Sequence, residues 1–417
     1  MSAMPLLDHS PRLLAAASMA DCITDNLATP PAPDYPPDDY SPNSPRWNAQ
    51  SLSRGAAGVA ILHGVRAQTG HGDWDRVRAW LTRAAADDIN ASETASLWIG
   101  APALAHAIAV SAPGMLPGPF ATLDRAVDQL TARRLHTAHA RIDRQDRPAL
   151  AEFDLVHGLS GLGAYQLRHH PDGALLRQVL EYLVRLTEPL TGRAVPGWWS
   201  CDPPSNQPRI LGGHGNLGMA HGIAGPLALL ALAHRAGVSV DGHDTAMTRI
   251  CTWLDRWRQT GPAGPWWPQR ITWAENRTGT PLEAGPARPS WCYGTPGLAR
   301  ALQLAGIALG DPARQQAAED ALTRCLADPH QLGQITDPAI CHGWAGLAAT
   351  VWYAALDARS SALRSHVNPV LHRLLRHATA AVEQRDGLLE GRAGVALVLH
   401  SLATGTDIRW ATSLCID

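Results

Sequence analysis

The sequence predicts an all-α protein of the α/α toroid class, a double-layered barrel of seven inner and seven outer helices. A Gly-rich motif opens an apolar, Ala/Leu-rich run seven times, with its first glycine at residues 55, 100, 158, 222, 294, 343 and 391. Between the copies lie segments whose apolar residues recur every three or four positions, which is typical of helices with one solvent-facing side. Repetition at intervals of 45 to 72 residues indicates a fold built from repeated helix pairs.

The composition describes a globular protein with a large apolar core. Of the 417 residues, 45% are hydrophobic and only 17% are charged. The formal net charge of −2 and the pI near 6.8 provide no positive field that would attract a polyanion. Neither nucleic acid nor an anionic membrane is therefore expected as the main partner.

Cysteine usage favours a cytoplasmic protein. The seven cysteines are an odd number spread over a long chain, so they are expected as reduced thiols and not as a disulfide framework. The apolar stretch at residues 13–17 is too short for a signal peptide. No segment approaches the roughly 18 uncharged apolar residues of a membrane span, so direct membrane insertion is not expected.

The chain is predicted to divide near residue 46. Residues 1–46 are expected to hold an amphipathic helix over 8–27 and a Pro-rich lead-in over 29–45. In the lead-in, fixed φ angles and missing N–H donors favour an extended, irregular chain. Residues 47–417 are expected to form the toroid domain.

The run that follows each motif is predicted to be an inner helix. Residues 224–233 and 346–355 are apolar on nearly all sides, as expected of helices that are buried all round. Closing the helix pairs into a ring would protect the end repeats that an open array leaves exposed. The clearest outer helices are predicted at residues 74–88, 173–187, 245–259, 311–328 and 361–384.

The paired glycines of the Gly-x-x-Gly motif are interpreted as helix-start residues. The first can leave helical φ and ψ without a clash, and the second is expected to let neighbouring inner helices approach closely. If all inner helices start on one side, the residue just before each first glycine points at an axial funnel. These pre-glycine residues are Arg54, Ile99, His157, His221, Tyr293, His342 and Glu390.

Three stretches interrupt this pattern. Residues 196–216 and 264–289 combine aromatic pairs with Pro and Gly, which indicates ordered loops or short strands over the mouth of the funnel. Long loops in compact domains are often functional. Residues 134–150 are polar and are interpreted as an excursion above the ring.

Two cysteines and a histidine of the repeats form a candidate zinc site. Cys292 and Cys341 each stand directly before a pre-glycine residue, and that residue is His342 in the second case. Two thiolates and an imidazole supply three bonds to Zn²⁺ and leave a fourth position open, which is typical of catalytic sites. A lone cysteine is more often a small buried hydrophobe, but three donors at equivalent repeat positions favour the metal. Such a soft, open site suits a substrate thiol, whose pKa falls on coordination.

Four further residues are candidates for proton transfer and charge stabilisation. A thiolate that adds to an electron-poor alkene leaves an enolate, and His221 is the expected proton donor because its pKa lies nearest neutral pH. Asp154 could orient an imidazole or only cap a helix. Arg288 could hold an enolate oxygen or pair with a structural carboxylate. Tyr293 could donate a hydrogen bond beside the metal ligand that precedes it.

These motifs resemble those of a known family. The segments that carry the resemblance are residues 216–225 (NLGMAHGIAG), 291–297 (WCYGTPG) and 341–343 (CHG). From about residue 50 to the C-terminus, the chain is similar to the LanC family of lanthionine synthetases, the stand-alone cyclases of lanthipeptide biosynthesis. The second repeat departs from the family pattern, with Pro102 where a small residue is expected.

The resemblance implies an α/α toroid with one catalytic Zn²⁺, whose fourth position takes water or a substrate thiolate. It implies that cysteine thiols of a dehydrated, leader-bearing precursor peptide add to dehydroalanine and dehydrobutyrine in a Michael-type reaction that forms lanthionine and methyllanthionine thioether rings. A dehydratase and a peptide transporter are candidate further partners. The family's metal ligands fall on Cys292, Cys341 and His342. Its acid/base and supporting residues fall on His221, Asp154, Arg288 and Tyr293.

Other functions fit parts of the same sequence. A LanC-like protein that binds glutathione or adds it to modified proteins, or a non-catalytic scaffold, would have the same site. A toroidal prenyltransferase also activates a thiol on zinc, but it holds the metal with Asp, Cys and His, which the doublet Cys341-His342 disfavours. A toroidal glycoside hydrolase needs two suitably spaced carboxylates, for which only Glu390 and Asp154 are candidates.

Overall fold

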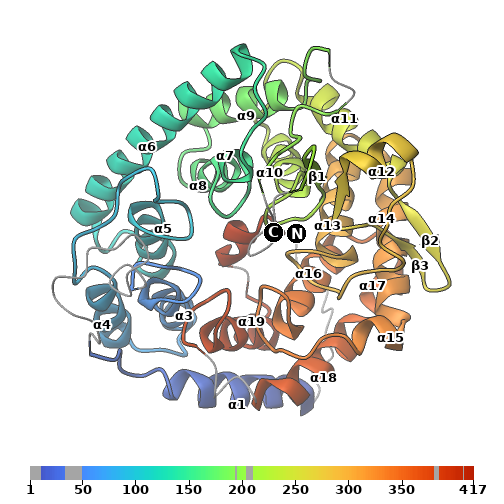
Figure 1. The fold of residues 1–417 in the computed structure, drawn as a ribbon. Helices are drawn as coiled ribbons and strands as arrows, with labels where there is room; N and C mark the ends of the chain where they lie inside the picture. The colour runs from blue at the N-terminus through green and yellow to red at the C-terminus, as the bar shows by residue number, and fades with distance from the viewer. Residues whose placement is uncertain (1–10, 33–48, 193–194, 203–209, 380–384, 407) are drawn as a thin grey trace. The chain divides into compact units, whose positions relative to one another are not determined.

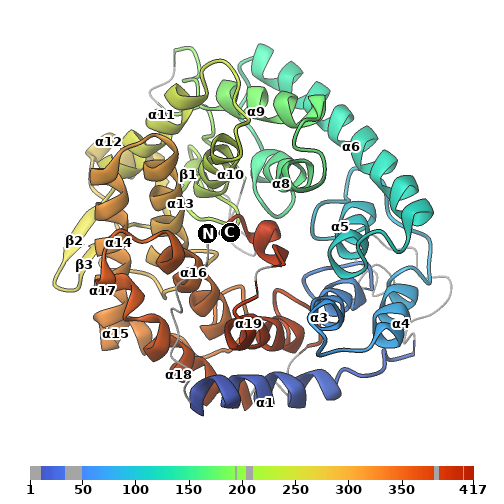
Figure 2. The ribbon, with the colours of Figure 1, turned by 180° about the vertical axis from the view of Figure 1, so that it is seen from behind.

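Helices make up most of the regular structure of the chain (Figures 1 and 2). The computed structural model describes residues 11–32, 49–192, 195–202, 210–379, 385–406 and 408–417. Most of the predicted Pro-rich lead-in and the predicted boundary near residue 46 lie outside the described residues. Among the described helices, none combines the length and the apolar character that crossing a membrane requires.

The chain forms two compact units, each assembled from separate stretches of sequence. Unit 1 comprises Met1–Leu130, Thr336–Leu356 and Arg364–Ala411. Unit 2 comprises Thr131–Ile335, Asp357–Leu363 and Thr412–Asp417.

Each copy of the motif is followed by a helix that is buried on nearly all sides. In α3, for example, every residue from Ala56 to Ala67 is buried. The prediction of buried helices after the motifs is therefore confirmed. These helices are α3 (Ala56–Gln68), α5 (Ala101–Ser111), α8 (Leu159–His169), α10 (Ala224–Arg235), α13 (Thr295–Ala308), α16 (Trp344–Asp357) and α19 (Arg392–Thr404).

The helices between the motifs expose one face, as predicted, but the single helix predicted over 361–384 is divided into two, over Ser361–Arg364 and Val367–Ala378. In α9, buried Leu176, Val179, Leu180 and Leu183 recur at three- and four-residue spacing. The two kinds of helix pack together within each unit: α3 packs on α4 in unit 1, and α13 packs on α14 in unit 2. The exposed helices are α4 (Trp74–Ala84), α6 (Pro117–Asp143), α9 (Ala174–Leu186), α11 (His243–Arg256), α14 (Pro312–Ala327), α17 (Ser361–Arg364) and α18 (Val367–Ala378).

The N-terminal helix α1 (Pro11–Asp25) packs against α19 and α18 within unit 1, and both ribbon views show it beside them. The residues that follow it are tied to the motif helices as well. The carbonyl oxygen of Leu27 lies 2.8 Å from both Trp80 Nε1 and His63 Nε2. Of the helix predicted over residues 8–27, the described part forms over Pro11–Asp25, and its buried residues Ala16, Ala20 and Ile23 belong to the core of this unit.

The two predicted loop stretches contain short strands, and one further strand, β2, lies just before the second stretch. β1 (His214–Asn216) pairs antiparallel with β4 (Arg270–Thr272), and β2 (Gln259–Gly261) forms a hairpin with β3 (Gly264–Trp266). β4 leads directly into α12 (Trp273–Thr278), which begins with a capping box. Short helical turns complete the described structure: α7 (Leu150–Phe153), α15 (Pro329–Leu332) and the 3₁₀ helix η2 (Trp410–Leu414).

The excursion predicted over residues 134–150 is wrong as far as residue 143, because those residues continue α6. The polar side chains that suggested a loop have partners near the end of this helix. Arg141, for example, forms a 2.6 Å ion pair with Glu152 in α7.

The second glycine of the motif makes room for the backbone of its own loop. A β-carbon on Gly346 would lie 1.8 Å from the carbonyl oxygen of Ile340, and one on Gly297 would lie 2.0 Å from that of Trp291. In both cases the blocking carbonyl stands six residues earlier in the chain. The nearest obstacle is therefore the loop before the motif, which folds under the helix start. Atoms of another repeat lie close as well in some copies, since a β-carbon on Gly58 would lie 2.8 Å from the amide nitrogen of Leu388.

Candidate metal and proton-transfer site

Backbone hydrogen bonds fix the two candidate cysteine ligands. In unit 2, the carbonyl oxygen of Cys292 accepts from the Met219 N–H at 2.9 Å and from the Ala220 N–H at 3.3 Å. In unit 1, the Cys341 N–H donates to the carbonyl oxygen of Leu389 at 2.9 Å. Each bond joins loops of successive repeats, so both cysteines lie on backbone that a neighbouring repeat holds in place.

Pre-glycine residues of different repeats meet within each unit, those of the third and fourth repeats in unit 2 and those of the first and last in unit 1. In unit 2, the imidazoles of His157 and His221 stack, with ring centroids 5.4 Å apart and planes inclined by 17°. In unit 1, the guanidinium of Arg54 forms an ion pair with the carboxylate of Glu390. The repeated loops therefore bring these positions together, as the motif spacing predicts.

His221 and Asp154 form a hydrogen-bonded pair in unit 2. His221 Nδ1 lies 2.6 Å from Asp154 Oδ2, and the side chains are 27% and 1% exposed. Burial alone would lower the pKa of His221, but the hydrogen bond and the charge of Asp154 outweigh it and raise this pKa above 6.5. Burial likewise opposes ionisation of Asp154, but hydrogen bonds from His157 and His221 lower its pKa to about 2.

Asp154 also closes its own loop. Its Oδ1 accepts from the backbone N–H groups of His157 and Gly158, the residues that precede α8. Its other oxygen faces His221. Both roles considered from the sequence, the cap and the partner of an imidazole, therefore fit the geometry of this one carboxylate.

Tyr293 lies against the loop of the preceding repeat. Asn216 Nδ2 donates a 2.9 Å hydrogen bond to Tyr293 Oη. Burial raises the pKa of Tyr293 to about 12, and the Asn216 bond opposes this only in part. The phenol therefore keeps its proton at neutral pH and can donate it in a further hydrogen bond.

Arg288 contributes its backbone to the same loop. A β-carbon on Gly294, which has a φ of +94°, would lie 2.6 Å from the Arg288 carbonyl oxygen. The Arg288 side chain is half-buried and makes no hydrogen bond or ion pair with the other residues that the structure describes. The alternative of a structural carboxylate partner is therefore not seen among those residues.

Two sets of side chains in the described part of the chain offer donor atoms that could hold a metal ion. They are Cys292 with Cys341 and His342, and Asp154 with His157 and His221. The first group is the one predicted from the sequence. The second is a poor metal site, because Oδ2 of Asp154 already bonds to Nδ1 of both imidazoles.

The donor set of the first group fits Zn²⁺. Two sulfurs and one imidazole nitrogen are ligands that zinc prefers, and three of them leave one tetrahedral position for a substrate. His342 Nε2 lies 2.8 Å from Asp337 Oδ2, which leaves Nδ1 as the nitrogen for a metal. Cys292 is 8% exposed, whereas Cys341 is half-buried.

Two residues of this region, Asp337 and Asn216, are not among those predicted. Each stands five residues before a pre-glycine histidine, His342 and His221. This shared spacing is a signal that comparison of the repeats could have revealed.

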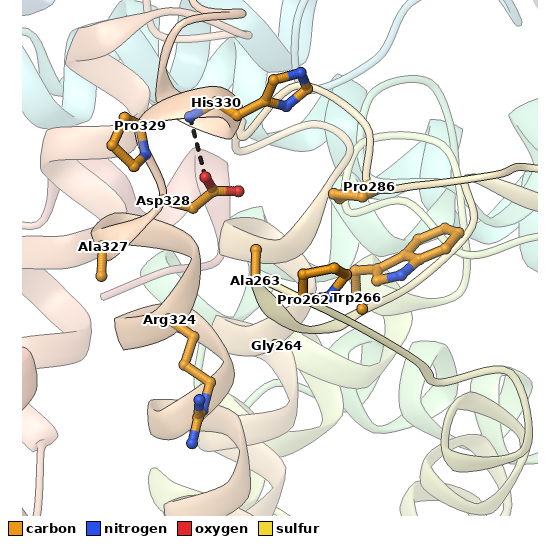
Figure 3. Close-up of a pocket in the computed structure, with 11 residues that line it drawn as sticks. Pro262, Ala263, Gly264, Trp266, Pro286, Arg324, Ala327, Asp328, Pro329 and His330 are labelled. Carbon is orange, nitrogen blue, oxygen red and sulfur yellow. Dashed lines mark hydrogen bonds between the residues drawn. The ribbon is translucent and has the colours of Figure 1, made fainter.

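A separate cavity of about 580 Å³ lies in unit 2 between the β2–β3 hairpin and the end of α14. Figure 3 shows Trp266 and several prolines around it, with the Asp328 carboxylate accepting from the His330 N–H at 3.0 Å. That bond caps the short helix α15. The described residues that line the cavity include none of the predicted site residues.

Comparison with known proteins shows the family. The sequence matches the family described as Lanthionine synthetase C-like protein over residues 46–415, and the chain belongs to this family. The Nisin biosynthesis protein NisC of Lactococcus lactis subsp. lactis is 27% identical over 258 residues, which cover 60% of this chain and 60% of that protein. The match thus spans less than two thirds of that relative's length.

A solved structure has a similar fold. The structure of a nisin cyclase matches with a TM-score of 0.72 and 21% sequence identity, over 89% of this chain and 93% of that one. This likeness shows the fold, and the all-α toroid class predicted from the sequence is confirmed.

Proposed function

We propose that the protein is a zinc-dependent lanthipeptide cyclase. In this proposal it adds cysteine thiols of a dehydrated precursor peptide to dehydroalanine and dehydrobutyrine, and so forms thioether rings. Membership of the lanthionine synthetase C-like family supports the reaction class. The names of the two relatives, which connect them to nisin biosynthesis and to cyclisation, support a peptide substrate.

One observation carries the proposal further: a candidate metal ligand and a candidate acid lie on adjacent, hydrogen-bonded loops. The Cys292 carbonyl oxygen accepts from Met219 and Ala220, and Ala220 directly precedes His221. Cys292 also contributes to the raised pKa of His221. A sulfur donor and an imidazole with a raised pKa are the two groups that a thiol addition needs in one place.

In the proposed mechanism, thiol activation, proton donation and positioning of the acid fall to different residues. When bound, Zn²⁺ supplies a Lewis-acid position at which a substrate thiol loses its proton near neutral pH. His221 donates a proton to the α-carbon of the enolate that sulfur addition leaves on the peptide. In this proposal, Asp154 holds His221 through Nδ1, so that Nε2 faces the substrate, and its negative charge favours the protonated form of the imidazole.

Tyr293 and Arg288 are proposed to support the substrate. The neutral phenol of Tyr293 can donate a hydrogen bond to a peptide carbonyl. The Arg288 guanidinium can stabilise the negative charge that develops on the enolate oxygen. Neither residue has to change its protonation state.

The proposed substrate implies its partners and its compartment. The precursor peptide must arrive already dehydrated, so a dehydratase would act before this protein. A leader segment would guide the peptide, and a peptide transporter would take the product. Reduced thiols and zinc are compatible with a cytoplasmic site of action.

Metal analysis of single variants tests the proposal. Cys292→Ala, Cys341→Ala and His342→Ala should each lose zinc and abolish ring formation, whereas the matched control Cys325→Ala, which removes a buried thiol of α14, should keep both. Rings are measured by mass spectrometry after thiol alkylation of a dehydrated precursor. Full zinc content in all three ligand variants would refute the metal site. Adducts with added glutathione in place of rings would support the alternative, a glutathione-adding protein.

A further inference from the structure

His342 has a carboxylate partner within its own loop. Its Nε2 lies 2.8 Å from Oδ2 of Asp337, and the two side chains are 33% and 25% exposed. Both residues belong to unit 1, five residues apart. The contact between the two side chains is therefore close, partly shielded from water and formed within one loop.

The loop fixes Asp337 independently of His342. Its Oδ1 accepts from the Ala339 N–H at 2.6 Å, and its carbonyl oxygen accepts from the Trp344 N–H at 3.0 Å. A β-carbon on Gly343 would lie 2.2 Å from that carbonyl, so only glycine lets the loop close here. One carboxylate oxygen thus holds the loop while the other faces the imidazole.

The same backbone arrangement recurs in other repeats. The carbonyl of Asn216 accepts from the Ile223 N–H at 2.9 Å, and that of Arg385 accepts from the Arg392 N–H at 2.8 Å, each across seven residues as in Asp337. Both side chains also reach a pre-glycine residue: Asn216 bonds to Tyr293, and Arg385 lies 4.0 Å from Glu390. In these three repeats, the fold therefore places the residue that stands five positions before the pre-glycine residue next to a pre-glycine side chain.

We infer that Asp337 is the positioning residue for His342 as a metal ligand, an inference that rests on the proposed zinc function. A metal-binding histidine usually donates its second N–H to a carboxylate, which fixes the tautomer and the ring orientation and makes the ligating nitrogen more basic. Asp337 supplies that acceptor at Nε2 and directs Nδ1 to the metal.

Zinc affinity tests the inference without reference to turnover. Asp337→Asn should weaken zinc binding by about 10- to 100-fold, as measured by competition with a chromophoric chelator. The control is Asp386→Asn, the same substitution in the next repeat, at a side chain of 28% exposure that pairs with Arg392. The control should bind zinc like the unaltered protein.

A second variant separates positioning from loop closure. Asp337→Ser keeps a short oxygen acceptor for the Ala339 N–H but cannot reach His342, so it should keep the fold by circular dichroism and show the same loss of affinity. Substitution with Co²⁺ adds a spectroscopic check, because a changed imidazole ligand shifts the visible bands and a merely structural role does not.

The outcomes distinguish this inference from the proposed function. If Asp337→Asn and Asp337→Ser both bind zinc with unaltered affinity while His342→Ala loses it, Asp337 does not position the ligand and the zinc site stands. If His342→Ala itself retains full affinity, the proposed zinc site fails, and the role of Asp337 fails with it.

Discussion

A 2.6 Å hydrogen bond joins Oδ2 of Asp154 to Nδ1 of His221, although 67 residues separate them in the chain. The carboxylate is buried and the imidazole is partly open to solvent. Asp154 therefore sets both the orientation and the protonation of His221, and its removal should have consequences that depend on pH.

The pH dependence of ring formation should move when Asp154 is replaced by Asn. A raised pKa means that the protonated His221 is present below that pKa and is lost as the pH rises through it. Without the carboxylate, burial lowers the pKa, so the alkaline limb of the rate profile should move to lower pH. At a pH above the pKa of His221 in both proteins, the variant should be slower than the unaltered protein, by about tenfold for each unit by which that pKa is lowered. Rates of ring formation at several pH values, with zinc content measured in parallel, check this; superimposable profiles would contradict it.

Acid stability should depend on Asp154 as well. Its pKa of about 2, against 3.8 unperturbed, means a stabilisation that is fully present above 3.8 and lost as the pH falls through 2. For this buried group the contribution is roughly 2 kcal/mol. Urea unfolding of the metal-stripped protein at pH 7 and at pH 2 should show a smaller pH dependence in Asp154→Asn, by about this amount. Equal pH dependence in the two proteins would exclude the linkage.

Replacing His221 by Asn should leave the metal in place and remove the acid. The variant is expected to bind zinc fully but to form few rings, or misplaced ones, because the enolate would lack the proton donor that we propose. A loss of about 10²- to 10⁴-fold is typical of general acids. The matched control is His170→Asn, at a histidine that follows α8. Unchanged ring formation in His221→Asn would exclude it as the donor.

The second motif glycine should be intolerant of even a methyl group. Gly346→Ala places a β-carbon 1.8 Å from a carbonyl oxygen and should cost at least about 2 kcal/mol of unfolding free energy, since the loop and the start of α16 must separate. Gly118→Ala is the control, because no atom lies within 4 Å of the added carbon. In α6 that change should stabilise the protein by up to about 1 kcal/mol. Thermal unfolding measures both, and similar melting temperatures would contradict the steric account.

Patterns that depend on side-chain periodicity were predictable from the sequence. Buried and half-exposed helices such as α3 and α9 follow from the spacing of apolar residues, and the repeat of glycines locates the helix starts. The helical character of residues 134–143 was not predictable in this way, because α6 is polar on several sides and its stabilising partners, such as Glu152, lie elsewhere in the chain.

Candidate site residues can be proposed from the sequence where their chemistry is unusual, and less readily where their role depends on the local shape of a loop. Cys292, Cys341 and His342 stand out because few residue types bind zinc and these recur at equivalent positions. Asp337 does not, since an Asp in a Pro-containing turn is common, and only the folded loop shows that its second oxygen faces His342. The role of the second glycine was missed for a similar reason: the sequence shows the missing side chain but not the carbonyl beneath it.

The loops that hold these residues are shaped by main-chain atoms. Carbonyl groups lie under the motif glycines, and amides of one repeat bond to carbonyls of the next. The side chain at a pre-glycine position is therefore not needed to build the loop, and each repeat can vary it independently. In evolutionary terms, the same loop backbone could acquire a metal ligand in one repeat, an acid in another and a partner of an ion pair in a third. Each change would need a substitution at one position and no change of the core.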